Sequence, residues 1–320
     1  MLDKGNIKLV DFYFNEITKK DAFSLYKDFI EKFIYSKIEN PVLAKYLVEN
    51  TLLNLKRGEI AFEDLAPIIY IHYNVYGVKW KKNLRHVIID EAQDYGEFQF
   101  STLKTILNSN SMTILGDIAQ GVHFYRGIED WNDFIEVEFP EDGATYLTLE
   151  KTYRTTKEIM DVANSVISKL PEKEKEGIVL GEPVINTKDS IRIYNKENDN
   201  EIIKTISERI NEYIENGYKS VAIIGKDMDE CKKIKKELSK LNKNINLIQS
   251  KDSEYKAGVS IVPSYLAKGL EFDSVILYNV SDKKYLENSL DIKLLYVAIT
   301  RAMSKLDIFY IKNKSKLLDI

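Results

Sequence analysis

Two adjacent carboxylates end an apolar run in the sequence HVIIDEAQDY, residues 86–95. An aspartate at the carboxyl end of a buried strand can hold Mg²⁺, and the next carboxylate can orient and deprotonate a water molecule. Nucleotide hydrolases need that division of labour, and Asp90 and Glu91 have the spacing for it. Acidic residues after a strand are also ordinary turn formers. This stretch alone leaves a hydrolytic site and a plain turn equally open.

Further polar residues follow later apolar patterns. The run MTIL at 112–115 ends in GDIAQ at 116–120, which places a carboxylate and an amide beside the first pair if the two strands are neighbours. In the stretch TLEKTYRTTKEIMDVAN, Tyr153 and Arg154 are expected to open a helix near a domain junction. From there an arginine can reach a phosphate held by another domain. The series is completed by YLAKGLEFDSVIL at 265–277 and LLYVAITRAMSKL at 294–306.

The order of hydrophobic patterns predicts an α/β protein. From Phe12 to about Tyr76 apolar residues recur at helical spacing, so this region is expected to be a helical layer. Short β-branched runs then alternate with helical patterns, as buried parallel strands do. These runs are VIID at 87–90, MTIL at 112–115, IRIY at 191–194, VAII at 221–224, VSIV at 259–262, SVILY at 274–278 and LDIFYI at 306–311. FPEDGATY at 139–146 combines Pro, Gly and acidic residues, which places a domain junction near Leu149.

The composition excludes several classes of protein. The chain of 320 residues is long enough for two domains, and its 44% hydrophobic and 30% charged residues fit a soluble globular protein. No apolar run approaches the roughly 20 residues that cross a bilayer, and the first residues lack a secretory signal, so we expect a cytoplasmic protein. The single cysteine, Cys231, excludes an internal disulfide and a thiolate metal cluster, and its charged helical surroundings predict an inert helix residue.

The charge of the chain argues against indiscriminate binding of nucleic acid, because the net charge is −4 and the pI is near 5.7. Two local basic segments remain. They consist of Lys79, Lys81, Lys82 and Arg85, and, on a predicted helix, of Lys232, Lys233, Lys235, Lys236 and Lys240. Charge patterning alone favours solvated faces for both segments.

Five stretches in this order resemble motifs II to VI of the superfamily 1 DNA helicases of the UvrD/Rep type. DEAQD resembles motif II, LGDIAQ motif III, LEKTYRTTKEIMDVAN motif IV, AKGLEFDSVIL motif V and LLYVAITRA motif VI. The resemblance covers about Val87 to Ile311. Two further stretches, LKRGEIAFEDLAPIIYI and VPSYLAKGLEFD, look closest to the branch that contains helicase IV and the RNA-polymerase-associated factor HelD.

The resemblance implies two RecA-like, parallel-sheet P-loop NTPase domains, of which the first is incomplete. Residues 1–82 would be a helical segment attached to the first motor domain. Residues 83–149 would be the C-terminal part of RecA-like domain 1A with motifs II and III, and residues 150–320 would be RecA-like domain 2A with motifs IV to VI. No large insertion separates motifs IV and V, where UvrD-type enzymes usually carry an accessory domain. This shortness again favours the HelD-like branch.

Carried onto this sequence, the motifs imply a site for ATP and Mg²⁺. Asp90 would bind Mg²⁺, and Glu91 would be the general base for the attack of water on the γ-phosphate. Gln120 would sense that phosphate, and Arg154 and Arg301 would approach it from the second domain. The other nucleotide-binding residues would be Tyr153, which would stack on adenine, Glu271, which would contact the ribose, and Gly269 in the same motif. For Tyr153 core packing and for Glu271 a place as a surface acid stay open.

The segment QGVHFYRG at 120–127 resembles the family's QSIYGWRG, in which an aromatic residue stacks on single-stranded DNA. Tyr125 takes that aromatic position, His123 stands where the family has another aromatic residue, and Arg126 completes the predicted nucleic-acid contacts. Stacking is worth roughly 1–3 kcal/mol per base and tolerates any sequence. His123 could equally be a hydrogen-bonded structural residue. Motif V departs from the family, because Pro263 and Tyr265 replace its Thr-x-His, so the DNA path there stays open.

A phosphate-binding loop is missing from these patterns. Motif I would be GxxxxGK[ST] after a strand, with backbone N–H groups around the phosphates and a lysine on the β- and γ-phosphates. The one Gly-Lys pair, Gly225-Lys226, lacks the upstream glycine and is followed by Asp227, so a structural role is expected for it. We therefore expect the loop to be supplied from outside this sequence, and the isolated chain to bind nucleotide weakly and to hydrolyse negligible ATP. The first sheet would then expose an edge.

Two functions stay open. The first is the C-terminal motor portion of an ATP-dependent helicase or translocase that moves along single-stranded DNA in the family's usual 3′-to-5′ sense. The alternative is part of a HelD-like factor that remodels RNA polymerase without unwinding DNA. A degenerate interaction scaffold is harder to reconcile with the presence of all five predicted catalytic residues, Asp90, Glu91, Gln120, Arg154 and Arg301. Pull-down with RNA polymerase, compared with binding of single-stranded DNA, separates the first two.

Overall fold

The computed structural model describes residues 20–77, 84–109, 111–122, 127–140, 143–188, 190–241, 245–250 and 258–319. Contacts divide the chain into two compact units. The first comprises residues up to Asp90 together with Tyr95–Leu115, and the second comprises Glu91–Asp94 and the residues from Gly116 onward. The domain boundaries expected from the sequence, near residues 82 and 149, stay a prediction.

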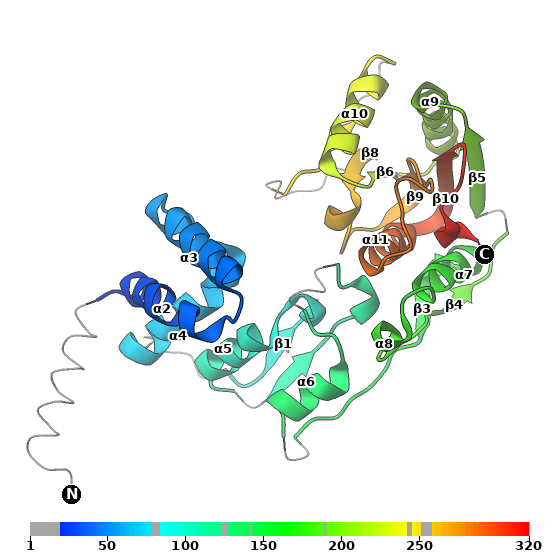
Figure 1. The fold of residues 1–320 in the computed structure, drawn as a ribbon. Coiled ribbons are helices and arrows are strands. Elements are labelled where there is room, and N and C mark those ends of the chain that lie inside the picture. Colours follow the sequence, from blue (N-terminus) through cyan, green and yellow to red (C-terminus); the bar gives the residue numbers. More distant parts are fainter. Residues whose placement is uncertain are drawn as a thin grey trace, which may run out of the picture. The chain divides into compact units, whose positions relative to one another are not determined.

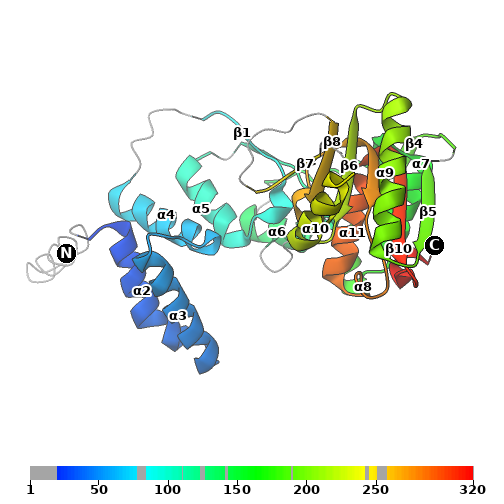
Figure 2. The same ribbon diagram turned by 90° about the horizontal axis from the view of Figure 1, so that it is seen from above.

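Three helices build the N-terminal part of the first unit as far as it is described, from residue 20 onward, as the helical spacing predicted (Figures 1 and 2). They are α2 (Ala22–Lys37), α3 (Pro41–Lys56) and α4 (Phe62–Tyr76). The apolar stripe of α2 carries Tyr26 and Ile30, which lie one turn apart and pack with Val48 and Ile68 of the other two helices. The buried hydroxyl of Tyr26 donates to Asp64 Oδ1 at 2.7 Å, so a polar contact also joins α2 to α4.

A two-stranded parallel sheet completes the first unit. Strand β1 (Val87–Ile89) pairs with β2 (Met112–Ile114), with Val87 opposite Met112, and helix α5 (Glu97–Leu107) lies between them in the sequence. The runs VIID and MTIL are therefore strands and neighbours, as predicted. The side chain of Ile88 remains 68% exposed, so a face of this small sheet is not covered by the described residues.

A six-stranded sheet in which all pairs are parallel forms the core of the second unit, in the order β5-β10-β9-β6-β8-β7 (Figure 1). Its strands are β5 (Ile191–Lys196), β6 (Ser220–Gly225), β7 (Asn246–Leu247), β8 (Gly258–Pro263), β9 (Phe272–Leu277) and β10 (Ala302–Ile311). The five remaining runs predicted to be strands all lie in it, which confirms the α/β class. Only the two-residue edge strand β7 had no counterpart among these runs.

Helices cover both faces of this sheet, so its strands are buried on two sides. Along β6, Ala222 and Ile224 pack with α7 (Lys157–Ile167) and α11 (Ser289–Thr300), whereas Val221 and Ile223 pack with α9 (Asp199–Glu215) and α10 (Met228–Ser239). This alternation follows from the two-residue period of a strand. Helix α11 is buried on nearly every side, and Arg301 follows its last residue.

The residues before α7 correct one prediction. Tyr153 and Arg154 do not open a helix: they lie in strand β3 (Lys151–Thr156), which pairs in parallel with β4 (Glu182–Ile185), and α7 begins at Lys157. The β-branched residues of KTYRTT favour a strand once a partner is present. The remaining short elements are η1 (Ala92–Asp94), η2 (Ile118–Gln120), α6 (Trp131–Glu138), α8 (Glu172–Lys175), η3 (Ser264–Leu266) and η4 (Lys316–Leu318).

Two expectations from composition can be compared with the described residues. Cys231 lies in α10 with no exposed surface, and burial raises the pKa of its thiol to about 12, as expected for an inert helix residue. In the described part of the chain, no helix combines the length and the apolar character needed to span a membrane.

Candidate active site

The carboxylate of Glu91 is positioned by a buried glutamine. Gln93 is 2% exposed; its Nε2 donates to Glu91 Oε2 at 2.7 Å, and its Oε1 accepts from the backbone N–H of Asp117 at 2.9 Å. A Cβ atom at Gly116 would lie 2.5 Å from Gln93 Oε1 and 3.1 Å from the backbone nitrogen of Gln93, so a larger residue there would displace the Gln93 amide. Glu91 itself has a φ of +54°, a conformation that non-glycine residues rarely adopt.

Gln120 is oriented from both ends of its amide. Asp117 caps the short helix η2, where its side chain accepts from the backbone N–H of Ala119 at 2.9 Å and from Gln120 Nε2 at 2.7 Å. The other end of the amide, Gln120 Oε1, accepts from Arg301 Nη2 at 2.8 Å. Burial raises the pKa of Asp117, and its hydrogen bonds oppose that rise. Two residues predicted to contact the γ-phosphate, Gln120 and Arg301, are therefore in direct contact.

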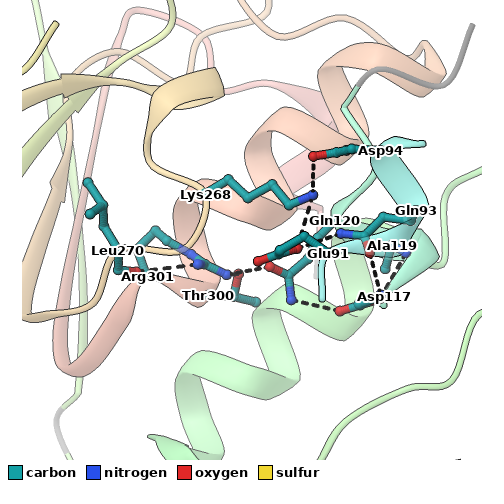
Figure 3. A network of polar contacts seen from close by, with 10 residues as sticks. All are labelled: Glu91, Gln93, Asp94, Asp117, Ala119, Gln120, Lys268, Leu270, Thr300 and Arg301. Carbon is teal, nitrogen blue, oxygen red and sulfur yellow. Dashed lines mark hydrogen bonds and ion pairs between the residues drawn. The ribbon is translucent and has the colours of Figure 1, made fainter. Parts of the chain in front are cut away.

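The guanidinium of Arg301 is held by hydrogen bonds, of which those to Leu270, Thr300 and Gln120 can be followed in Figure 3. The residue is 1% exposed and donates to Val297 O at 3.1 Å, to Leu270 O at 3.3 Å and to Thr300 Oγ1 at 3.1 Å, besides Gln120. Burial lowers the pKa of Arg301, the positive charge of Arg154 lowers it further, and the carboxylate of Glu91 opposes both. Four of the predicted catalytic residues, Glu91, Gln120, Arg154 and Arg301, thus belong to one polar environment.

Lys268 connects this environment to the loop before β9 (Figure 3). Its Nζ lies 3.1 Å from Glu91 Oε2 and 2.7 Å from Asp94 Oδ2, and its side chain is only 11% exposed. Burial alone would raise the pKa of Glu91, but the hydrogen bond from Gln93 and the charge of Lys268 more than offset it, so the pKa of Glu91 is lowered.

The predicted nucleotide-binding residues lie on two surface segments. Arg154 Nε is 2.7 Å from Glu271 Oε1, and both side chains are largely exposed. Tyr153, on the same strand, is 68% exposed and does not pack in the core. Gly269 has a φ of +75°, which only glycine adopts without strain. The structure thus brings Arg154 and Glu271 together.

Other predicted residues are placed as follows. Asp90 is exposed directly after β1. His123, Tyr125 and Arg126 lie outside the described residues. Gly225 ends β6, and Lys226 forms an ion pair with Asp291 at 2.5 Å. Both observations are consistent with the structural role expected for this Gly-Lys pair.

Three residues of this network were not predicted, namely Gln93, Asp94 and Lys268. They stand inside the motif-like stretches DEAQD and AKGLEFD, so their positions were marked although their contacts were not. The carboxylate expected from GDIAQ is that of Asp117, which contacts Gln93 and Gln120. Among the described residues, no group of three or more His, Cys, Asp or Glu side chains is arranged to hold a metal ion.

Sequence comparisons match both halves of the chain to helicase domains. The UvrD/REP helicase N-terminal domain matches residues 13–132, and the UvrD-like helicase C-terminal domain matches residues 147–252 and 226–313. A probable DNA helicase II homolog of Mycoplasma capricolum is 30% identical over 207 residues, 62% of this chain and 27% of that protein. The ATP-dependent DNA helicase Rep of Buchnera aphidicola is 25% identical over 222 residues, 66% of this chain and 33% of that protein.

A solved structure is also similar, the C-terminal domain of a possible DNA helicase from Lactobacillus plantarum. It shares 28% sequence identity with a TM-score of 0.43 and covers 52% of this chain and 92% of its own. The present chain spans 27% and 33% of the length of the two relatives named above.

Proposed function

This chain belongs to the family of UvrD/Rep-type helicases, and from that premise we propose that it is the C-terminal motor portion of an ATP-dependent DNA helicase or translocase. The observation that carries the proposal is the continuous polar network from Glu91 through Gln93 and Asp117 to Gln120 and Arg301. Its members come from three of the family's motifs. A network of this kind holds carboxylate, amide and guanidinium groups in fixed positions before a substrate arrives.

The proposed roles follow from the chemistry of phosphoryl transfer, in which positioning and charge stabilisation supply most of the catalysis. Glu91 would orient the attacking water. Gln120 and Arg301 would face the γ-phosphate. Because Arg301 is 1% exposed and already donates to Gln120, a bound phosphate would have to replace some of its present contacts. Arg154 differs, because it is exposed and paired with Glu271. When a nucleotide binds, the ion pair between Arg154 and Glu271 would have to break. Arg154 would then contact the phosphates, and Glu271 would contact the ribose.

Asp90 would hold Mg²⁺. Its exposed carboxylate is the hard oxygen ligand that this ion takes, usually one or two at a time, with the remaining positions filled by water and substrate phosphates. The absence of a dedicated acidic cluster among the described residues fits this arrangement. When bound, the ion would neutralise charge on the phosphates. Tyr153, 68% exposed, would offer its ring to the adenine.

The nucleic-acid partner of the motor would be single-stranded DNA. Tyr125, His123 and Arg126 would contact it, with the aromatic ring stacking on a base. Movement would run in the 3′-to-5′ sense. No GxxxxGK[ST] sequence occurs in the 320 residues, so hydrolysis would require a phosphate loop supplied together with this chain.

The test is reconstitution. The chain is mixed with a polypeptide that carries a strand followed by a GxxxxGK[ST] loop, and phosphate release from ATP is followed with and without single-stranded DNA. We expect DNA-stimulated turnover only in the mixture. Glu91→Gln is the matched control, because it keeps the size of the side chain and removes the carboxylate that orients water. A well-folded complex without turnover, or turnover equal in Glu91→Gln, would contradict the proposal.

A further inference from the structure

The second unit contains a cavity of about 420 Å³. This volume is within the range of sites that hold small ligands, about 300–1,000 Å³. Side chains from β3, β4 and β10 line it, together with Tyr218, which precedes β6. Tyr153, the residue predicted to stack on adenine, is not among the described residues that line the cavity. The cavity is therefore distinct from the proposed adenine contact.

Two of the strands that border the cavity depart from regular pairing. In β10 the pairing with β9 shifts between Ala302 and Lys305, and in β3 the pairing with β4 shifts between Thr152 and Thr156. Such β-bulges redirect side chains and are over-represented next to ligand sites. The side chains that β3 and β10 contribute to the cavity all come from these two irregular stretches.

Thr156 lines the cavity with a buried hydroxyl that lacks a partner. The residue is 3% exposed, and its Oγ1 forms no hydrogen bond within the described part of the chain. Thr156 is the N-cap of α7, yet its side chain does not cap the helix as threonine commonly does at this position. A buried polar group without a partner is unfavourable and rare unless water or a ligand completes it. A ligand in the cavity can supply the missing partner.

The charges next to the cavity favour an anion. Arg154 and Lys305 both line it, and the N-terminus of the 11-residue helix α7, with its partial positive charge, begins beside it. Two carboxylates nearby are already engaged. Glu271 pairs with Arg154 at 2.7 Å, and Glu158, in the first turn of α7, accepts from the backbone N–H of Ser190 at 2.6 Å. An anion in the cavity would share Arg154 with Glu271.

We propose that this cavity binds a small phosphate monoester. Its phosphate is held by Arg154, Lys305 and the hydroxyl of Thr156, because guanidinium, ammonium and hydroxyl groups are usual donors to phosphate oxygens. The organic part of the ester lies against the apolar side chains of the lining, Ile185 and Met303. The proposal does not rest on the proposed function, because it concerns the chain alone without a phosphate loop.

The test is an NMR titration of the complete chain, labelled with ¹³C at the methyl groups of isoleucine and methionine, with phenyl phosphate. Inorganic phosphate and phenol are the separate halves of this probe. We expect the Ile185 and Met303 signals, identified with Ile185→Val and Met303→Leu, to shift with a dissociation constant on the order of 1 mM. Each half should bind at least about fivefold more weakly, since it leaves either the cations or the apolar walls without a partner. Binding in this range is too weak to appear in a titration at micromolar nucleotide.

Thr156→Val and Thr155→Val form a matched pair of variants. Both remove a buried hydroxyl that forms no hydrogen bond among the described residues, but only Thr156 lines the cavity. Phenyl phosphate should bind about tenfold more weakly to Thr156→Val, because a hydrogen bond to a charged group is lost, and unchanged to Thr155→Val. Neither variant should melt much below the native chain, because neither loses a hydrogen bond of the free protein.

Lys305→Met should also weaken binding about tenfold, and Lys305→Arg should retain most of it. If Lys305→Met does not fold, Lys305→Gln decides in its place. Lys284→Met is the matched control, because it removes a partly exposed lysine of the same unit outside the cavity. Tyr153→Ala should bind like the native chain, which separates the cavity from the proposed nucleotide site.

Absence of any shift of the Ile185 and Met303 signals at about 10 mM phenyl phosphate, ten times the expected constant, would overturn the proposal. Equal weakening in Thr155→Val and Thr156→Val would also overturn it, and so would a loss of binding in Tyr153→Ala. Inorganic phosphate that binds as tightly as phenyl phosphate would refute the apolar part of the site. The titration involves neither ATP hydrolysis nor DNA, so a failed reconstitution counts against the proposed function and not against this cavity.

Discussion

Replacing Arg301 should destabilise the second unit strongly, although this arginine was predicted only as a phosphate contact. It is 1% exposed and donates four hydrogen bonds, to Val297, Leu270, Thr300 and Gln120. In Arg301→Met, acceptors buried around the guanidinium lose their donor, at about 1–3 kcal/mol each. Part of this loss of stability is offset, because the charged guanidinium no longer has to be desolvated on folding. We expect a net loss of about 2–4 kcal/mol in the free energy of unfolding.

Arg154→Met is the matched comparison, because it makes the same chemical change at an exposed arginine. The side chain of Arg154 is 47% exposed and its ion pair with Glu271 lies at the surface, where such pairs contribute about 0–1 kcal/mol. The assay is thermal and urea unfolding followed by circular dichroism. For a unit of this size each kcal/mol corresponds to roughly 2–4 °C in Tm. Arg301→Met should therefore melt roughly 5–15 °C lower and Arg154→Met within about 3 °C of the native chain.

Equal melting temperatures in the two variants would refute this reasoning, because they would mean that the buried hydrogen bonds of Arg301 carry no net stability. The difference also affects functional tests. If an Arg301 variant loses nucleotide binding, unfolding and loss of the proposed phosphate contact are both involved. Arg154→Met tests the proposed phosphate contact of Arg154 without a large loss of stability.

Two further predictions concern charged pairs away from the site. Arg209 Nε lies 2.7 Å from Asp307 Oδ2 with both side chains nearly inaccessible, and Arg209 also pairs with the partly exposed Glu212. Because Glu212 would still pair with Arg209, Asp307→Ala should cost about 1–3 kcal/mol in the free energy of unfolding measured with urea. The double change Arg209→Met, Asp307→Leu should be close to neutral, and equal losses in the two variants would contradict this. Burial would raise the pKa of Asp199, but the hydrogen bond from Lys233 and that from the hydroxyl of Tyr278 more than offset it, so the pKa is lowered. The ionised Asp199 therefore stabilises the folded chain fully above pH 3.9 or so, about the pKa of an unfolded aspartate, and this stabilisation is lost as the pH falls through the lower pKa of the folded chain. In Asp199→Asn, Tm should consequently fall less steeply below about pH 4 than in the native chain. Parallel curves of Tm against pH in the two proteins would count against this.

Local patterns sufficed for the strands that are buried on both faces. The run VAII was predicted as a strand because β-branched residues buried on both faces leave no polar alternation, and β6 is buried on both faces. Strand β3 was missed for the opposite reason. It has exposed residues on both faces, runs directly into the helical pattern of α7, and depends on β4, whose first residue, Glu182, lies 31 positions from Lys151. Strand pairing over such a distance leaves no local signal.

The same distinction applies to the candidate site. Glu91, Gln120 and Arg301 were predicted because they stand in recognisable motif contexts, and the structure joins Gln120 to Arg301. The contacts of Lys268 with residues some 174 positions earlier could not be predicted, because ion pairing of this kind is decided by tertiary packing. The burial of Arg301 was equally hidden, since an arginine at the end of an apolar helix is expected to reach outward to solvent or ligand.

Calorimetric titration with Mg-ATPγS tests the central claim most directly, namely that this chain supplies the hydrolysing residues of an ATP site and needs a separate phosphate loop. The account predicts no saturable heat for the chain alone, and saturable binding once a polypeptide with the GxxxxGK[ST] loop is added, weakened in Arg154→Met. Micromolar binding by the chain alone that disappears in Arg154→Met would contradict it, because the second unit would then capture nucleotide without any phosphate loop.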